Sequence, residues 1–170
     1  MLLFSYAEEA RLRPEWCQLL PEGMSHLTAA RIGTAGYTAA LCVEALVEKG
    51  LKPADGKVVV SGATGGVGSV AVMLLSQMGF DVVALSGKAE AEESFLKSIG
   101  ATEVLARQSF EEKARALNKE LYAGAVDVAG GNVLANILSM TQKYGSFRLL
   151  NRIIASISSF RLCLLLWLGE

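Results

Sequence analysis

The fold is decided by residues 57–68, which read Lys-Val-Val-Val-Ser-Gly-Ala-Thr-Gly-Gly-Val-Gly. The run Lys57–Ser61 is rich in β-branched residues and predicts a buried strand. Residues 67–78 carry apolar side chains at helical spacing, and Gly79 supplies the expected C-terminal stop. A strand, a glycine-rich loop and a helix are therefore expected in direct succession.

The same strand and helix unit recurs further along the chain. Further strands are predicted at residues 81–85, 103–106 and 125–129, and further helices at residues 89–98, 109–118 and 132–142. Ser109 is the expected N-cap of the helix at 109–118, with Glu112 completing a capping box. Strands joined by helical crossovers pair in parallel, because the crossover returns the chain in the same direction. The pattern predicts an α/β fold, a doubly wound parallel Rossmann sheet with helices on both faces.

The segment before this unit predicts a long helix. It covers residues 25–49, with Ser25 as its cap, and it has a weak point at residues 33–36, where two glycines and a threonine lower helix propensity. Residues 1–24 form a short piece of extended character that cannot build a core alone. We therefore expect the compact domain to begin near residue 25.

The composition changes abruptly from residue 146 onward, to Leu, Ile, Ser and Arg. We expect a fifth strand near residues 147–150, followed by an amphipathic or poorly ordered apolar extension. A membrane span needs about 18 to 20 uninterrupted apolar residues. Arg152 and Arg161 interrupt this segment, so insertion into a membrane is not predicted.

Composition narrows the classes of function. The chain has 170 residues, of which 52% are apolar and 19% charged, which fits one globular domain. A net charge of -1 gives no electrostatic reason to bind nucleic acid. The three scattered cysteines and single histidine show no CxxC motif, so no zinc site is expected. The odd number of cysteines and the lack of a signal peptide favour a reducing, cytoplasmic location.

The glycine loop has the chemistry of a phosphate-binding turn. Ala63, Gly65 and Gly68 have the A-x-G-x-x-G spacing. Gly65 lets the backbone approach a pyrophosphate, Gly68 lets helix and strand pack closely, and the N–H groups at the helix start attract the anion. The alternative is that the glycines serve only a tight turn and bind no ligand. Because the strand, loop and helix occur in the required order, we interpret the motif as a dinucleotide site.

A second signal follows the next predicted strand. Dinucleotide-binding domains that prefer NAD(H) carry an Asp or Glu there, on the adenosine ribose. This chain has Ser86-Gly87-Lys88 instead, so a hydroxyl and an ammonium group are available for a 2′-phosphate. The sequence therefore predicts NADP(H) over NAD(H). The alternative is that Lys88 is an ordinary solvated lysine at the start of a helix.

Four motifs together resemble a known family. They are GTAGYTA at 33–39, SGATGGVGS at 61–69, SGK at 86–88 and VDVAGG at 126–131. Over residues 11–145 the sequence resembles the medium-chain dehydrogenase/reductases, and within them the zinc-independent, quinone oxidoreductase-like branch that includes acrylyl-CoA reductases. Such proteins have a GroES-like catalytic domain around a central Rossmann domain.

The resemblance implies a division of the chain into three parts. Residues 1–24 would be a remnant of the hinge to a GroES-like catalytic domain that is missing, residues 25–150 the NADP-binding Rossmann domain, and residues 151–170 a divergent apolar tail. The sheet would be truncated at its C-terminal strands, and the chain alone could be inactive.

The resemblance, together with the loop and the Ser-Lys pair, also implies the cofactor contacts. They are Thr38, Ala63, Thr64, Gly65, Gly66, Val67, Gly68, Ser86, Lys88 and Gly130. Thr38 would lie near the nicotinamide or its phosphate by the resemblance alone, and it fits equally well as a small residue in a helix packed on the sheet.

By the same resemblance, the function is that of an NADPH-dependent oxidoreductase that transfers a hydride to an activated alkene or quinone, with a small acrylyl-CoA-like substrate. The alternative is a non-catalytic nucleotide-binding or self-associating module. No catalytic residue is assigned; His26, Tyr37, Tyr122 and Tyr144 are candidates by type only. Asp127 is expected to cap backbone N–H groups or border the cofactor. Exposed apolar surface predicts a homo-oligomer.

Overall fold

The computed structural model describes residues 11, 13–113 and 118–149, and within them the chain forms one five-stranded parallel sheet. The strand order is β3-β2-β1-β4-β5. The sheet confirms the predicted doubly wound α/β fold. Its strands are β1 (Lys57–Ser61), β2 (Val82–Ser86), β3 (Glu103–Ala106), β4 (Tyr122–Asp127) and β5 (Thr141–Leu149).

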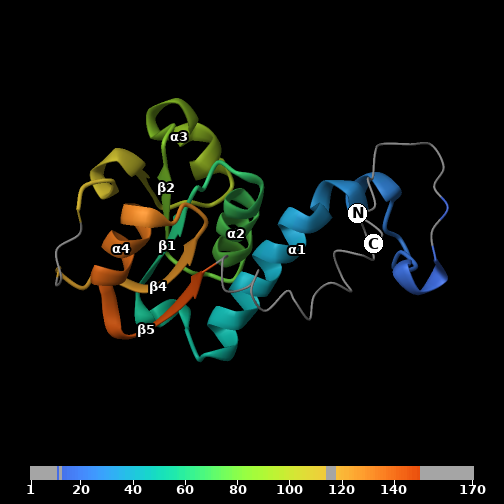
Figure 1. Ribbon diagram of the computed structural model, residues 1–170, viewed down its shortest axis with the longest axis horizontal. Coiled ribbons are helices and arrows are strands. Elements are labelled where there is room, and N and C mark those ends of the chain that lie inside the picture. The colour runs from blue at the N-terminus through green and yellow to red at the C-terminus, as the bar shows by residue number, and fades with distance from the viewer. Residues whose placement is uncertain (1–10, 12, 114–117, 150–170) are drawn as a thin grey trace.

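Helices cover both faces of the sheet (Figure 1). Because side chains alternate along a strand, Val58 and Val60 pack on one face with α1 and α2, while Val59 packs on the other face with α4. Ala63 of the glycine loop belongs to the first of these two apolar clusters. The helices are α1 (His26–Glu48), α2 (Gly66–Gln77), α3 (Ala89–Ser98) and α4 (Gly131–Ser139), with 3-10 turns η1 (Pro14–Trp16), η2 (Pro53–Asp55) and η3 (Arg107–Phe110).

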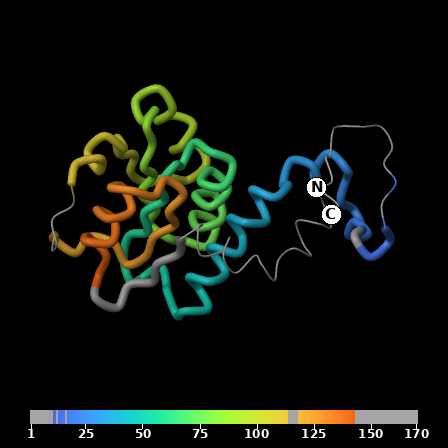
Figure 2. Tube along the Cα trace, in the orientation of Figure 1, coloured from blue at the N-terminus to red at the C-terminus, as the bar shows by residue number. Residues whose placement is uncertain are grey.

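Helix α1 is interrupted where the sequence predicts a weak point. Gly33 has φ 49° and ψ -165°, which is outside the helical region, so two helical segments meet there. Ser25 caps the first segment, as expected, because its hydroxyl accepts a hydrogen bond from the Thr28 N–H at 3.1 Å. The second segment packs on α2 and the sheet, whereas the first projects beyond them (Figure 2).

The α-helix predicted at residues 109–118 is wrong for its described part. The chain forms the short turn η3 and then leaves helical geometry at residues 111–113; residues 114–117 lie outside the described ranges. The Ser109 hydroxyl donates to the Ala106 carbonyl at 2.7 Å, in place of the expected capping box. Phe110 is buried, and its carbonyl accepts from Asn136 of α4 at 2.9 Å. Asn136 also binds the Glu112 carbonyl, so α4 holds this segment in a non-helical path.

The fourth helix and the fifth strand also differ from the prediction. Helix α4 ends at Ser139 and not at residue 142, and β5 begins at Thr141, well before the predicted strand at 147–150. The Met140 carbonyl accepts from the N–H groups of Leu121 (2.7 Å) and Tyr122 (3.2 Å). These bonds draw the chain into the sheet directly after α4, and β4 starts at Tyr122 for the same reason.

The expectations for the two termini fall outside the structure. Residue 150, the predicted apolar tail at 151–170, and most of residues 1–12 lie beyond the described ranges. Among the described helices, none combines the length and the apolar character that crossing a bilayer requires.

Candidate functional site

The loop between β1 and α2 turns sharply, and its backbone is exposed at Gly65. Gly62 adopts φ 60°, a left-handed conformation that favours glycine. The Ala63 N–H then donates to the Leu85 carbonyl of β2 at 3.1 Å, and the Gly65 N–H donates to the Gly62 carbonyl at 2.9 Å. Gly65 is the N-cap of α2. The loop is therefore held from inside by backbone bonds.

Close contacts require a glycine at position 68 and crowd the glycine at position 66. A Cβ at Gly68 would lie 2.3 Å from the Gly62 oxygen, so only glycine lets the first turn of α2 pass so near the loop. A Cβ at Gly66 would lie 3.1 Å from the Ala35 Cβ of α1. Close packing at Gly68 agrees with the sequence analysis, while the crowding of Gly66 by α1 could not be foreseen from the loop motif.

The start of α2 leaves three backbone N–H groups outside its intrahelical hydrogen bonds. The first intrahelical bond runs from Ser69 N–H to the Gly65 carbonyl at 2.9 Å, so the amides of Gly66, Val67 and Gly68 precede it without an intrahelical partner. The positive end of the helix dipole adds to their attraction. Gly65 and Gly66 are exposed and carry no side chain that would block a ligand. The loop thus fits a diphosphate.

Ala63 is an interior residue of the loop, and its predicted contact with the cofactor stays a prediction. It is fully buried, and its N–H is engaged by β2, so it shapes the loop from within. Among the residues predicted to bind the pyrophosphate, the available amides are those at the start of the helix.

The end of β2 brings the predicted Ser86 close to the loop. Ser86 is 1% exposed, and its hydroxyl lies 3.2 Å from the Thr64 hydroxyl. It also accepts a hydrogen bond from the Lys88 N–H at 3.1 Å. Thr64 and Ser86 therefore join the two loops, and Ser86 fixes the turn that leads to the exposed Lys88.

An open pocket of about 530 Å³ lies at this turn. It is lined by residues 87–91 together with Ala106, the last residue of β3, and Gln108 of η3. Lys88 contributes an ammonium group and Glu90 a carboxylate, so both signs of charge border the pocket. The sequence analysis considered Lys88 alone and did not anticipate Glu90.

Arg107 is a candidate site residue that sequence analysis missed. A Cβ on Gly87 would lie 3.4 Å from the Arg107 Cζ, so the guanidinium group lies against the Ser86-Gly87-Lys88 turn. Its Nε donates to Glu111 Oε1 at 2.8 Å, which orients it. Arg107 follows β3, and only the parallel pairing of β2 and β3 brings it to this turn.

Gly130 lies at the corresponding position after β4. Its φ is 72°, a Cβ there would meet open space, and it is the N-cap of α4. Asp127 is 2% exposed, and its Oδ2 accepts from the Gly130 N–H at 2.9 Å, which confirms the expected capping role. Asp127 Oδ1 accepts from the hydroxyl of Ser61 at 2.6 Å. Because β1 and β4 are neighbours, Gly130 lies at the same edge as the glycine loop.

Thr38 is in the second segment of α1 and 8% exposed. Its hydroxyl donates to the Thr34 carbonyl one turn earlier, at 2.7 Å. The side chain is thereby engaged within its own helix, and its predicted contact with the nicotinamide stays a prediction.

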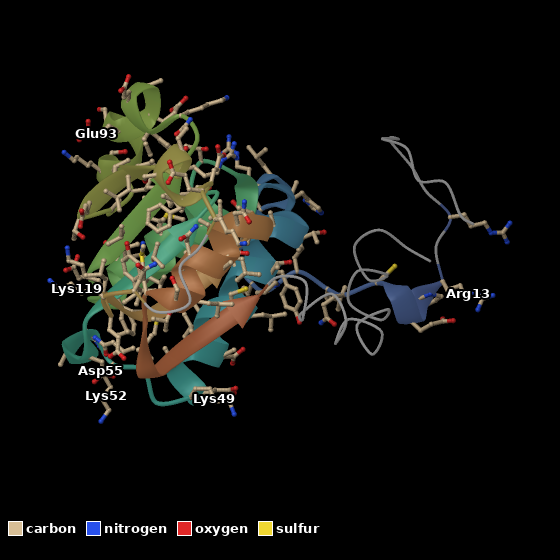
Figure 3. All side chains as sticks on the ribbon, turned by 60° about the vertical axis from the view of Figure 1, so that its left-hand side comes forward. Arg13, Lys49, Lys52, Asp55, Glu93 and Lys119 are labelled. Carbon is tan, nitrogen blue, oxygen red and sulfur yellow. The ribbon has the colours of Figure 1, made fainter. Side chains whose placement is uncertain are left out.

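The candidate proton donor on β4 lies away from the glycine loop. Tyr122 is 3% exposed and opens β4, beside Lys57, at the opposite edge of the sheet from the glycine loop. Lys52 and Asp55, just before β1, mark that edge (Figure 3). Burial, with a smaller contribution from Glu103, raises the pKa of Tyr122 to about 12.

The remaining candidates belong to α1 and β5. His26 is the exposed first residue of α1, and Tyr37 is 41% exposed on the same helix. Tyr144 belongs to β5, and its side chain lies outside the described part of the chain. Within the described residues, no three His, Cys, Asp or Glu side chains are grouped as a metal site, so we assign no zinc ligand.

Comparisons with known proteins agree with this geometry. The family described as "Zinc-binding dehydrogenase" matches residues 66–151, half of the chain, and the family described as "Glutamate/Leucine/Phenylalanine/Valine dehydrogenase" matches residues 28–91. The acrylyl-CoA reductase AcuI of Ruegeria pomeroyi is 44% identical over 142 residues, which is 83% of this chain and 42% of that protein. The chain therefore spans less than half the length of this curated relative.

Solved structures give the same result. The yhdH oxidoreductase of Salmonella enterica, crystallised with NADP, superposes with a TM-score of 0.78 at 47% identity, covering 82% of this chain and 43% of that one. The yhfP protein of Bacillus subtilis, crystallised with NAD, has a TM-score of 0.72 at 45% identity, covering 77% of this chain and 40% of that one. On the family match and these structural likenesses, the chain belongs to the zinc-binding dehydrogenase family, the medium-chain dehydrogenase/reductases.

Proposed function

We propose that this chain is the cofactor-binding domain of an NADPH-dependent oxidoreductase. The observation that carries the proposal is the combination, at one sheet edge, of two features. One is a glycine loop whose helix start leaves the N–H groups of residues 66–68 without an intrahelical partner, and the other is a cationic turn after β2. The relative from Ruegeria pomeroyi is an acrylyl-CoA reductase, and the structural relative from Salmonella enterica binds NADP. The first fact supports a small activated alkene, such as an acrylyl thioester, as the substrate, and the second supports NADP(H) as the coenzyme. A quinone is the other proposed substrate, supported by the 45% identical relative from Bacillus subtilis that is named a putative quinone oxidoreductase.

We assign the cofactor contacts from the geometry above. The amides of residues 66–68 hold the diphosphate, with Gly65 leaving room for it, and Gly130 borders the nicotinamide side. Lys88 and Arg107 bind the 2′-phosphate, while Thr64 and Ser86 fix the turn that presents Lys88. Thr38 is retained as a proposed nicotinamide contact on the resemblance alone.

The bound coenzyme would supply the hydride, which passes from the nicotinamide to the activated alkene or quinone. The residues of this chain bind and orient the coenzyme, so that its reactive face is held in one position. Residues 25–150 are proposed as the Rossmann domain, flanked by a hinge segment at 1–24 and an apolar tail at 151–170. A cytoplasmic location fits these assignments.

The NADP-bound and NAD-bound relatives make coenzyme preference the decisive test. We expect the full chain to bind NADPH more tightly than NADH by about tenfold or more, since charged hydrogen bonds to a phosphate are each worth about 1.5 to 3 kcal/mol. Lys88→Glu is expected to remove this preference, because it places a carboxylate beside the phosphate. Calorimetric titration with both coenzymes measures it, and Lys97→Glu, at the far end of α3, is the matched control.

Equal affinity of the unaltered chain for NADPH and NADH would contradict the NADP(H) assignment. So would an unchanged preference in Lys88→Glu.

The alternative function is a non-catalytic nucleotide-binding module. It is favoured by one observation, that Tyr122, the buried candidate proton donor on β4, lies at the opposite edge of the sheet from the glycine loop. Oxidation of NADPH by this chain in the presence of an acrylyl thioester or a quinone, followed by absorbance, distinguishes the two. Turnover supports the enzyme, whereas retained NADPH binding without turnover supports the module.

A further inference from the structure

The hydroxyl of Ser61 makes three hydrogen bonds at the end of β1. It is fully buried and donates to Asp127 Oδ1 at 2.6 Å. It accepts from the backbone N–H groups of Val128 at 2.9 Å and Ala129 at 3.2 Å. A hydroxyl has one proton and two lone pairs, so all its bonding capacity is used here. Ser61 thereby connects β1 to the turn that follows β4.

Asp127 continues this connection to the next residue of the turn. Its second carboxylate oxygen accepts from the Gly130 N–H at 2.9 Å. The N–H groups of residues 128–130 therefore all point inward, to two buried side chains.

The carbonyl groups of this turn must point the other way. The described chain has no cis peptide bond, and in a trans peptide the N–H and C=O groups point in opposite directions. The carbonyls of Val128 and Ala129 belong to the same peptide groups as the N–H groups of Ala129 and Gly130. They are consequently directed away from Ser61 and Asp127, and the turn offers acceptors to a ligand.

The turn lies where a dinucleotide crosses the sheet. Strands β1 and β4 are neighbours at the point where the order of the strands reverses, and ligands of doubly wound sheets bind across that point. The glycine loop adjoins the turn directly, because a Cβ on Gly62 would lie 3.5 Å from the Val128 Cβ. Lys88 and Arg107 lie on the β2 and β3 side, which leaves the β4 side for the other half of the cofactor.

We propose that Ser61 is a positioning residue for the nicotinamide half of the cofactor. With Asp127 it holds three N–H groups inward, so that the carbonyls of residues 128 and 129 face donors on the ligand, which are the ribose hydroxyls and the carboxamide N–H₂. This inference rests on the proposed function, and Ser61 itself does not touch the cofactor.

The test compares two ligands on the full chain. NADPH contains both halves, whereas 2′,5′-ADP contains only the adenosine half with its 2′-phosphate. We expect Ser61→Ala to weaken NADPH binding by about tenfold and to leave 2′,5′-ADP binding within about twofold. Lys88→Ala is the matched comparison and should weaken the binding of both ligands, while Ser61→Thr, which keeps the hydroxyl, should restore NADPH binding. Amide hydrogen exchange at residues 128–130 should rise in Ser61→Ala.

The outcomes separate this inference from the function on which it rests. If Ser61→Ala weakens the binding of both ligands equally, the role of Ser61 is merely structural and the inference is overturned. The inference is also overturned if Ser61→Ala leaves NADPH binding unchanged. Should Ser61→Ala fail to fold, Asp127→Asn makes the same comparison, because it keeps an acceptor for Gly130 and disrupts the bond to Ser61. An unaltered chain that binds neither ligand overturns the proposed function as well.

Discussion

Gly68 lies where the first turn of α2 passes over the Gly62 carbonyl. The 2.3 Å that would separate its Cβ from that oxygen is far below any normal contact, and the obstructing atom is backbone. A side chain cannot rotate away to relieve it, so the loop or the helix start must move. The same residue therefore serves both stability and the geometry of the phosphate cradle.

Gly68→Ala is expected to lower the free energy of unfolding by about 2 kcal/mol or more, and to weaken NADPH binding. Chemical denaturation and coenzyme titration measure the two effects. Ser69→Ala, at the next residue along the chain, should change stability by less than about 0.5 kcal/mol. A Gly68→Ala variant as stable as the unaltered chain would contradict the crowding described here.

Tyr122 makes the stability of the fold depend on pH in the alkaline range. Burial raises its pKa to about 12, whereas in the unfolded chain the group titrates near the ordinary tyrosine pKa of about 10. Above that value the unfolded state loses the proton while the folded state retains it, so stability falls as pH rises. The expected slope is up to about 1.4 kcal/mol per pH unit until the folded-state pKa is reached.

Tyr122→Phe should remove this part of the alkaline loss, as measured by denaturation at a series of pH values from 9 to 12. Lys57 also makes stability fall as pH rises. Its hydrogen bond and ion pair with Glu103 raise its pKa, and the stabilisation that they provide is lost as pH rises through that pKa. Lys57→Met therefore serves as a second comparison. An identical pH slope in Tyr122→Phe and the unaltered chain would refute the assignment to Tyr122.

At the scale of elements, local and distant interactions compete for the same backbone. Residues 109–113 have helix-compatible composition, yet their carbonyl groups accept hydrogen bonds from two side chains of α4. Asn132 donates to the Glu111 carbonyl at 2.9 Å, and Asn136 donates to the carbonyls of Phe110 and Glu112. Burial of Phe110 adds to this. Helix α1 is the opposite case, because its interruption follows from a local property of Gly33 that the sequence already displays.

The interruption of α1 should not tolerate a side chain. At φ 49° and ψ -165° a residue with a Cβ is strained, at a cost of about 1 to 3 kcal/mol. Gly33→Ala and Gly33→Asn are both expected to lower the free energy of unfolding by about this amount, since Asn tolerates left-handed helical geometry but not this region. Arg31→Ala, on the exposed part of the same helix, is the control. A neutral effect at Gly33 would mean that α1 can be continuous.

At the scale of the whole molecule, the first segment of α1 exposes large apolar side chains. Leu27 is 59% and Ile32 44% exposed, on the segment that projects beyond the sheet (Figure 1). Exposed apolar surface of this kind promotes association because burial removes it from water.

We therefore expect a dimer or larger species at micromolar concentration in sedimentation. The double change Leu27→Lys and Ile32→Lys should shift the chain toward monomer. Leu138→Lys, at a comparably exposed position on α4, should leave the association unchanged. Sedimentation of the unaltered chain as a clean monomer would contradict the prediction.

The sequence by itself determined the unit of β1, glycine loop and α2, the further strands up to β3, and the weak point in α1. These features depend on residue period and on glycine conformation, which are properties of neighbouring residues. The tertiary structure alone decided the path after β3, the early start of β5, the approach of Arg107 to Gly87 and the bond between Ser61 and Asp127. In each of these the partner is distant in sequence, and its position is defined only when the sheet has paired and its helices have packed.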